Sequence, residues 1–234
     1  MQQIKKLVPE KFKARFRQLK LDYLDGYSTK SYSQEGEDMI LRRIFVNVAT
    51  GFYVDVGAHH PKRFSNTYYF YNVGWRGINI DARPGCMADF NKLRPRDINI
   101  EAAIDRERRE LTYYMFNEPA LNTFDSALSI ARNRGDNRII AEKTIVTQKL
   151  VDVLQQHLPD RQAIDFISID VEGLDLEVLQ SNNWELFRPE YVLVECAKTS
   201  LRDIDSDEIY RFMADKGYSI FAKTVKTVFY KNAV

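Results

Sequence analysis

The chain has 234 residues, and its 44% share of hydrophobic residues is sufficient for one large globular domain with a sizeable core. The formal net charge of +1 gives no overall positive field, which argues against a nucleic-acid partner. The two cysteines lie far apart, and no apolar run approaches the roughly 20 residues of a membrane span, so we expect a cytoplasmic protein with reduced thiols.

The first predicted element is a basic amphipathic helix. Residues 1–20 contain seven Lys and Arg residues against one Glu. The apolar residues recur at helical spacing: Ile4, Val8, Phe12, Phe16 and Leu19. Pro9 is a point at which this helix can break. The helix can make a peripheral contact with an anionic membrane, or it can dock on the domain or on a second subunit of a homo-oligomer. We assign residues 1–30 to this segment and 31–234 to one domain.

Beyond this segment, strand and helix patterns alternate. In chain order, the sequence predicts a helix over 38–46, strands over 52–56 and 78–81, a helix over 84–93, a strand over 98–103, extended segments over 111–116 and 143–150, a short helix capped by Asp152, a strand over 164–169, a helix over 174–180, a strand over 191–196, a helix over 206–216 and two strands within 219–231. Residues 117–142, rich in Asn, Ser, Gly and Arg, are predicted to be an irregular functional segment or lid.

This alternation predicts an α/β fold with a mostly parallel, Rossmann-like sheet and helices on both faces. The last two predicted strands form a C-terminal hairpin, which adds an antiparallel strand to the sheet. That ending distinguishes the class I methyltransferase variant of the sheet from the dehydrogenase variant.

Acidic residues end the first two predicted strands. Asp55 and Gly57 close the first strand, and Asp81 closes the second at a spacing close to that of nucleotide-binding βαβ units. The glycine triplet that binds a pyrophosphate is missing, because Ala-His-His follows Gly57. A ligand with an ammonium group and a ribose but no phosphate, such as S-adenosylmethionine, suits two carboxylates. A nicotinamide-dependent oxidoreductase is the alternative that the missing triplet disfavours.

A second group of acids follows two later strands. Asp170, Glu172 and Asp175 come after the strand over 164–169, and Glu195 lies near the end of the next strand. If these strands are adjacent, Asp170 and Glu195 lie together and can hold Mg²⁺ or Mn²⁺. Alternatively, one carboxylate acts as a general base for a hydroxyl. Glu172 and Asp175 can instead start the following helix, where negative charge is favourable.

Polar side chains also occupy the loop after the first strand. We predict that His60 acts as a general base near neutral pH. The alternatives for both His59 and His60 are a role as a metal ligand or a hydrogen bond with the loop backbone. Ser65, Asn66 and Thr67 either cap the next helix or point toward a cofactor carboxylate.

Several blocks in this order resemble the FkbM-type S-adenosylmethionine-dependent methyltransferases: YSQEGEDMIL, FYVDVGAHHP, SNT, GWRGINIDARP, ISIDVEGLDLEVL and YVLVEC. The resemblance covers residues 31–231. It implies a class I methyltransferase fold and methylation of hydroxyls on sugars or macrolide-type natural products. One departure is that the second acid, often Glu followed by Pro in the family, reads Asp-Ala-Arg-Pro here.

The resemblance also implies roles for individual residues. Asp55 and Gly57 would surround the methionine part of the cofactor, Asp81 would hold the ribose diol, and Ala103 with neighbouring Glu101 or Ile104 would border adenine. Together with the loop residues, the predicted cofactor-binding set is Gln34, Asp55, Gly57, Ala58, Ser65, Asn66, Asp81, Ala82 and Ala103.

We therefore expect an O-methyltransferase that acts on a hydroxyl of a sugar, glycolipid or related natural product. The predicted catalytic residues are Asp170, Glu172 and His60, and the predicted metal ligands are Asp170 and Glu195. Arginines of the 117–142 segment would either meet a phosphate on the acceptor or lie in solvent. A non-catalytic binding subunit on the same scaffold is the alternative from another functional class.

Overall fold

The computed structural model describes residues 10–24, 26–196 and 200–233. The chain divides into two compact units, Met1–Ser31 and Tyr32–Val234. The first unit contains α1 (Glu10–Tyr23), and the part of the predicted N-terminal helix before residue 10, with the predicted break at Pro9, lies outside the described residues. No helix in the described ranges is long and apolar enough to span a bilayer.

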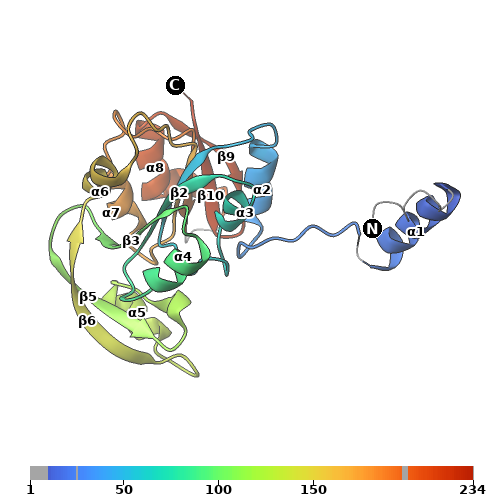
Figure 1. Ribbon diagram of the computed structural model, residues 1–234. Coiled ribbons are helices and arrows are strands. Elements are labelled where there is room, and N and C mark those ends of the chain that lie inside the picture. Colours follow the sequence, from blue (N-terminus) through green and yellow to red (C-terminus); the bar gives the residue numbers. More distant parts are fainter. Residues whose placement is uncertain (1–9, 25, 197–199, 234) are drawn as a thin grey trace. The chain divides into compact units, whose positions relative to one another are not determined.

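A seven-stranded sheet forms the centre of the second unit (Figure 1). Its strands, in spatial order, are β3 (Ile98–Glu101), β2 (Arg76–Asp81), β1 (Phe52–Val56), β7 (Phe166–Ile169), β8 (Tyr191–Glu195), β10 (Thr227–Asn232) and β9 (Tyr218–Lys223). All neighbouring strands pair in parallel except β10, which is antiparallel to both β8 and β9. The predicted mostly parallel sheet with a C-terminal antiparallel hairpin strand is therefore confirmed.

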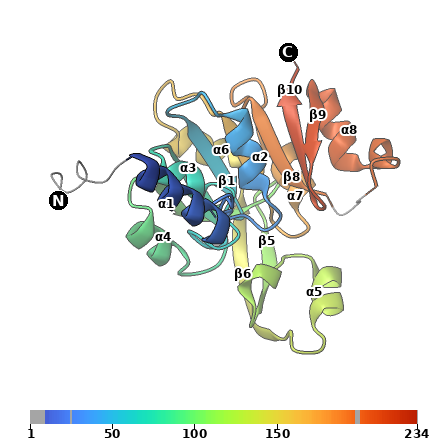
Figure 2. The same cartoon turned by 90° about the vertical axis from the view of Figure 1, so that its right-hand side faces the viewer.

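Helices cover both faces of this sheet, as predicted (Figure 2). One face packs against α2 (Glu37–Ile44) and α3 (Tyr68–Asn72), and the other against α6 (Leu150–His157), α7 (Asp175–Gln180) and α8 (Glu208–Asp215). Side chains alternate along the strands, so each strand contributes to the hydrophobic core on both faces of the sheet. In β1, Tyr53 packs on the side of α2 and α3, and Val54 packs on the side of α6, α7 and α8. The short η3 (Ile204–Ser206) precedes α8.

Three local predictions differ from the structure. The strand predicted over 98–103 is two strands, because the chain leaves the central sheet after β3 and β4 (Ala103–Ile104) pairs with β6 instead. The helix predicted from residue 84 is α4 (Met87–Leu93), because Pro84 and Gly85 form a turn in which the φ of Gly85 is +80°. Asp152 lies in the first turn of α6, whose N-cap residue is Lys149.

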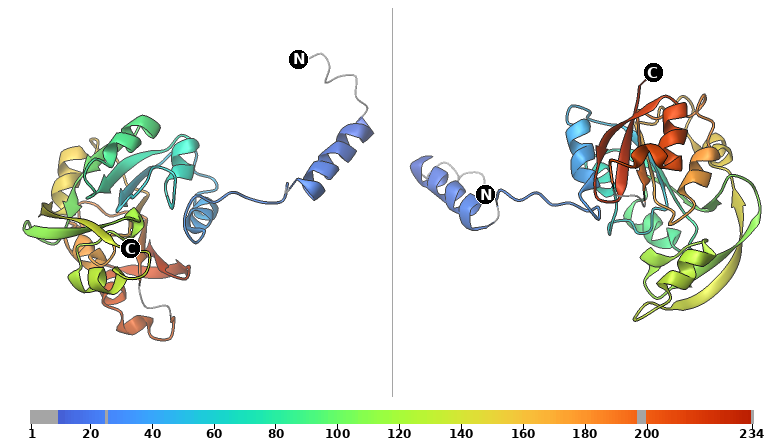
Figure 3. Two further views of the ribbon diagram at one scale, coloured as in Figure 1. Left: turned by 90° about the horizontal axis from the view of Figure 1, so that it is seen from below. Right: turned by 180° about the vertical axis from the view of Figure 1, so that it is seen from behind.

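Residues 110–148 form an arm that extends from the central sheet (Figures 2 and 3). It consists of β5 (Glu110–Phe116) and β6 (Ile139–Gln148) as an antiparallel pair, with η2 (Pro119–Leu121) and α5 (Ser126–Arg132) between them. Asp125 caps α5 by accepting a hydrogen bond from the N–H of Leu128. The predicted irregular segment is thus partly regular, and its last residues already belong to β6.

Candidate active site

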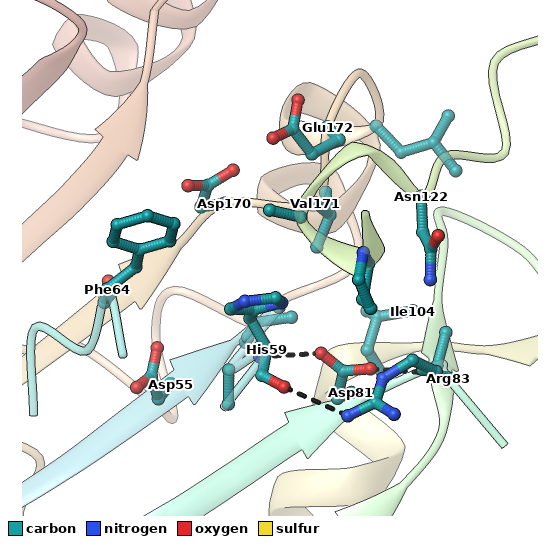
Figure 4. Close-up of a pocket in the computed structure, with 18 of the residues that line it drawn as sticks. Asp55, His59, Phe64, Asp81, Arg83, Ile104, Asn122, Asp170, Val171 and Glu172 are labelled. Carbon is teal, nitrogen blue, oxygen red and sulfur yellow. Dashed lines mark hydrogen bonds between the residues drawn. The ribbon is translucent and has the colours of Figure 1, made fainter. Parts of the chain in front are cut away.

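The main pocket lies at the carboxyl ends of β1, β2 and β7, the edge where parallel α/β sheets bind ligands. It contains about 950 Å³ of empty space, a volume that includes open solvent at its mouth. Asp81 and Arg83 lie at one end of this space, and Asp170 and Glu172 lie at the other (Figure 4). Most of the predicted site residues are therefore gathered around one pocket.

Gly57 makes the sharp turn after β1. Its φ of +82° is in the left-handed region, and its N–H donates to the carbonyl oxygen of Ile80 over 2.9 Å. A Cβ at this position would lie 1.8 Å from the carbonyl oxygen of Asp170. Only glycine therefore lets the chain after β1 approach the end of β7, which brings acids of both strands to the same pocket.

Asp55 lines the pocket, and its carboxylate is largely buried. The Oδ2 atom accepts a hydrogen bond from Thr67 Oγ1 over 2.7 Å. Burial raises the pKa of Asp55 to about 6, while the Thr67 hydrogen bond and the charge of Arg94 act in the opposite direction. The side chain is thus ionised above about pH 6 and suits an ammonium group, as its predicted place near the methionine part requires.

A fully buried arginine supports this carboxylate from behind the pocket wall. Arg94 Nη2 donates to Thr67 Oγ1 over 3.0 Å and to Tyr53 OH over 2.8 Å, and its Nε donates to Asp97 Oδ2 over 2.8 Å. Because Thr67 Oγ1 accepts from Arg94, its own proton is directed to Asp55. Nothing in the sequence singles out Arg94, since Tyr53 and Thr67, which it contacts, are distant in the chain.

Asp81 is fixed by the backbone at the other end of the pocket. Its Oδ2 accepts from the N–H of His59 over 2.7 Å, and its Oδ1 accepts from the N–H of Arg83 over 2.8 Å. Each carboxylate oxygen has two lone pairs, so each can accept one more hydrogen bond. The geometry fits the two neighbouring hydroxyls of a ribose, the role predicted for Asp81.

The structure brings His59, and not the predicted base His60, to the pocket. His59 Nε2 is buried with no hydrogen-bond partner among the described residues, and burial lowers the pKa of this side chain. His60 Nδ1 instead accepts from the N–H groups of Lys62 and Arg63, both over 3.0 Å. His60 therefore has the alternative role of binding the loop backbone.

Of the residues predicted to border adenine, Ile104 lines the pocket and Ala103 and Glu101 do not. Ala102 and Ile104 line the pocket, whereas Ala103 does not and is 1% exposed. Successive side chains of an extended segment point to opposite sides, so these two neighbours face the pocket together and Ala103 faces away.

The remaining predicted contacts are divided between the pocket and the core. Asn66 lines the pocket and its Nδ2 donates to Ser168 Oγ over 3.0 Å. Ser65 is not among the lining residues, because its buried Oγ accepts from the N–H of Tyr68 over 3.0 Å at the start of α3. Three further predicted residues line the pocket: Gln34, Ala58 and Ala82.

The later acids form a carboxylate cluster, which consists of Asp170, Glu172 and Glu195. One oxygen of each lies within 4.8 Å of the others, so Asp170 and Glu195 do lie close together. Asp170 Oδ1 is enclosed without a hydrogen-bond partner in the described part of the chain. Burial, followed by the charges of Glu195 and Glu172, raises the pKa of Asp170 well above its usual value. Asp170 is thus a strong acceptor of a proton or of a cation.

Two cations partly compensate the cluster. Arg132 of α5 forms an ion pair with Glu172, and Lys226 Nζ lies 3.4 Å from Glu195 Oε1. Burial raises the pKa of Glu172, and the hydrogen bond from Arg132 opposes that shift. Glu172 and Glu195 therefore have positive partners, which leaves Asp170 as the member without one among the described residues.

Asp175 belongs to the helix start and not to the pocket. It is the first residue of α7, and its two oxygens accept from the N–H groups of Val171 over 3.1 Å and Gly173 over 3.2 Å. Asp175 therefore has the alternative role described for it, at the start of the following helix. This role does not apply to Glu172, which precedes the helix with a φ of +56° and lines the pocket.

The arm supplies the outer wall of the pocket. Tyr113, Asn122 and Phe124 line it, and the ring centroids of Tyr113 and Phe124 are 4.6 Å apart. Thr123 Oγ1 donates to the carbonyl oxygen of Glu172 over 2.7 Å, which connects the arm to the carboxylate cluster. The sequence indicated a functional segment here but gave no signal for these individual residues.

The family model described as "Methyltransferase FkbM domain" matches residues 55–220, well over half of the chain. The chain belongs to the FkbM methyltransferase family. It is accordingly an S-adenosylmethionine-dependent methyltransferase, and the oxidoreductase alternative is wrong. The residues present fit this cofactor, because Asp55 and Asp81 offer one carboxylate to an ammonium group and one to a ribose.

Solved methyltransferase structures are similar to the FkbM chain at low identity. A TehB-like S-adenosylmethionine-dependent methyltransferase from Corynebacterium glutamicum has 10% identity and a TM-score of 0.44, with 95% of this chain and 97% of that chain covered. Precorrin-6y C5,15-methyltransferase from Geobacter metallireducens has 12% identity and a TM-score of 0.43, with coverage of 87% and 90%. Aeropyrum pernix fibrillarin with natively bound S-adenosyl-L-methionine has 12% identity and a TM-score of 0.43, with coverage of 77% and 66%. No curated protein matches the sequence.

Proposed function

We propose that this methyltransferase methylates a hydroxyl oxygen of a sugar, glycolipid or related natural product. The observation that carries the proposal is the carboxylate cluster at the pocket end opposite Asp81, with Asp170 Oδ1 unpartnered among the described residues. Carboxylates are suitable hydrogen-bond acceptors for a polyhydroxylated acceptor. The near-zero net charge makes a nucleic-acid acceptor a poor alternative.

A neutral hydroxyl requires a base because it must lose its proton as it forms the new bond to carbon. When bound, S-adenosylmethionine supplies an electrophilic methyl group on its sulfonium. Asp170 and Glu172 line the pocket, and burial raises the pKa of each, which makes either carboxylate a stronger base for the hydroxyl proton than an exposed one. Their positions on the loop after β7 also let them orient the acceptor, which supplies part of the rate enhancement.

The same residues can act through a divalent ion. Asp170 and Glu195, with Glu172 beside them, would hold Mg²⁺ or Mn²⁺, which prefer carboxylate ligands. Such an ion would lower the pKa of the acceptor hydroxyl. Lys226 and Arg132 already neutralise part of the cluster, so a base role without metal is equally consistent with the charges.

The predicted phosphate contact in the arm needs revision. Arg132 is bound to Glu172 and to the carbonyl oxygen of Leu121, so it is not available to an acceptor phosphate in this arrangement. Arg134 and Arg138 are exposed residues of the same segment and remain candidates for a charged acceptor.

The test is methyl transfer from methyl-labelled S-adenosylmethionine to a panel of methyl glycosides, nucleotide sugars and glycolipids, with mass spectrometry of the products. We expect one methyl group on an oxygen, and we expect Asp170→Asn to lose turnover but keep cofactor affinity. Asp160→Asn, which removes an exposed carboxylate that does not line the pocket, is the matched control. Transfer only to nitrogen or carbon would contradict the proposal. Cofactor binding without transfer to any acceptor would favour the non-catalytic alternative.

A further inference from the structure

We propose that α1 attaches this methyltransferase to an anionic lipid surface. With 3.6 residues per turn, four of the five large apolar side chains of the helix fall within about 60° of its circumference, and Leu21 lies on the opposite side. This apolar stripe consists of Phe12, Phe16, Leu19 and Tyr23, and their exposed fractions are 67%, 73%, 47% and 78%. A continuous stripe of aromatic and aliphatic side chains on a short helix is a surface that needs a partner.

Cations flank this stripe on both sides. On the helical projection, Arg15 and Lys11 follow one edge of the stripe, and Lys20, Lys13 and Arg17 follow the other. Arg15 and Lys20 are nearest, each about 70° from the centre of the stripe. A helix in the headgroup region requires this pattern, because its apolar side chains enter the acyl boundary while the flanking cations reach lipid phosphates.

Charge is strongly separated between this segment and the rest of the chain. Residues 1–23 contain seven Lys and Arg against two acids, whereas the remaining residues contain 27 Lys and Arg against 31 acids. The catalytic domain therefore has no net attraction to an anionic membrane, and the N-terminal segment has to supply it. Each cation near such a surface improves partitioning by about fivefold.

The length of α1 determines its orientation relative to a bilayer. Its 14 residues span about 21 Å, which is less than the roughly 30 Å of a bilayer core. The helix would thus lie in the plane of the interface and not cross it. An enzyme held in this way meets acceptors that are attached to lipid, such as the glycolipids among the proposed substrates, although vesicle binding itself does not depend on that proposal.

The first experiment is sedimentation of the full chain with vesicles of phosphatidylcholine mixed with phosphatidylglycerol, compared with pure phosphatidylcholine. We expect co-sedimentation with the anionic vesicles at low salt and its loss at high salt, where the charges are screened. Absence of binding to the anionic vesicles at low salt would overturn the proposal.

The apolar stripe is tested with Phe12→Ala combined with Phe16→Ala, because alanine keeps the helix propensity. The matched control is Ile130→Ala with Ile140→Ala, two exposed apolar residues of the arm. We expect the α1 variant to lower vesicle partitioning at least about tenfold, and the control to leave it unchanged. Unchanged partitioning in the α1 variant would overturn the proposal.

The cations are tested with Arg15→Gln combined with Lys20→Gln, and the control is Lys92→Gln with Lys143→Gln, which removes the same charge from exposed sites elsewhere. We expect about a 25-fold loss of partitioning only in the α1 variant. Light scattering and thermal unfolding accompany both pairs of variants. The lipid proposal is rejected if the wild type does not bind the vesicles and the α1 variants change the oligomeric state or the melting temperature. In that case the helix docks on protein. Unaltered S-adenosylmethionine affinity in all variants separates this result from the proposed reaction.

Discussion

Gly57 and Asp170 approach each other so closely that a Cβ on Gly57 would lie 1.8 Å from the carbonyl oxygen of Asp170. The first residue follows β1 and the second follows β7, so this contact joins the two strand ends proposed to carry the cofactor and acceptor sides of the pocket. A carboxylate on each strand reaches the same space because glycine occupies the turn.

Gly57→Ala should therefore destabilise the fold and abolish cofactor binding. The left-handed φ alone costs about 1–2 kcal/mol for alanine, and the clash with backbone brings the expected loss to about 3 kcal/mol or more. Gly85→Ala is a matched control, because the φ of Gly85 is +80° and a Cβ there meets nothing within 4 Å. Urea unfolding measures both variants. An equal loss at the two glycines would show that the contact with Asp170 is unimportant.

The pKa of Asp55, raised to about 6 by burial, predicts the pH dependence of cofactor affinity. An ionised Asp55 attracts the ammonium group, so affinity should rise as the pH increases through about 6. Thr67→Val removes the hydrogen bond that lowers this pKa, and the rise should move to higher pH. Thr147→Val, which removes a buried hydroxyl outside the pocket, should leave the midpoint unchanged. Titrations between pH 5 and 8 check this, and a common midpoint for the two variants would argue against the role of Asp55.

Burial raises the pKa of Asp175 to about 7, and this predicts the sign of a stability change. Because the folded state binds the proton more tightly than the unfolded state, the stabilisation is complete below about pH 4. It is then lost as the pH rises through about 7. The free energy of unfolding of the wild type should thus fall across this window relative to Asp175→Asn, which cannot titrate. Parallel stability curves for the two proteins would refute the assignment.

The carboxylate cluster gives a prediction about metal removal. If Asp170 and Glu195 hold a divalent ion, EDTA should abolish methyl transfer and Mg²⁺ or Mn²⁺ should restore it. Glu195→Gln should then weaken binding of the metal more than it weakens binding of the cofactor. Full activity in EDTA would exclude a metal and leave Asp170 or Glu172 as the base. Full activity in Asp170→Asn as well would remove the cluster from the mechanism.

Periodicity and strand-end chemistry predicted the sheet, its antiparallel strand and the acids around the pocket. Asp55 and Asp81 were identifiable because each closes an apolar run, and such runs become adjacent parallel strands. Proximity of Asp170 and Glu195 followed from the same rule, since β7 and β8 are neighbours.

Features that depend on contacts between distant segments were not predictable. His59 and His60 are adjacent in the same loop, and the sequence does not show that His59, with a left-handed φ of +54°, is the one that lines the pocket. Arg94 gave no signal, because two of its partners, Tyr53 and Thr67, lie far away in the sequence, in β1 and before α3. Ala103 faces away from the pocket while its predicted neighbour Ile104 lines it, because the chain leaves the central sheet between β3 and β4.

The most direct test of this account is calorimetric titration with S-adenosylmethionine and, separately, NAD, of the wild type and of Asp81 variants. The wild type should bind S-adenosylmethionine and not NAD. Asp81→Ala should lose about 1.5–3 kcal/mol of cofactor binding, the value of charge-assisted hydrogen bonds. Asp81→Asn, which keeps an oxygen acceptor for the loop backbone, should lose less, and Asp89→Ala on the exposed side of α4 should lose none. No binding of S-adenosylmethionine, or unaltered affinity in Asp81→Ala, would contradict the account.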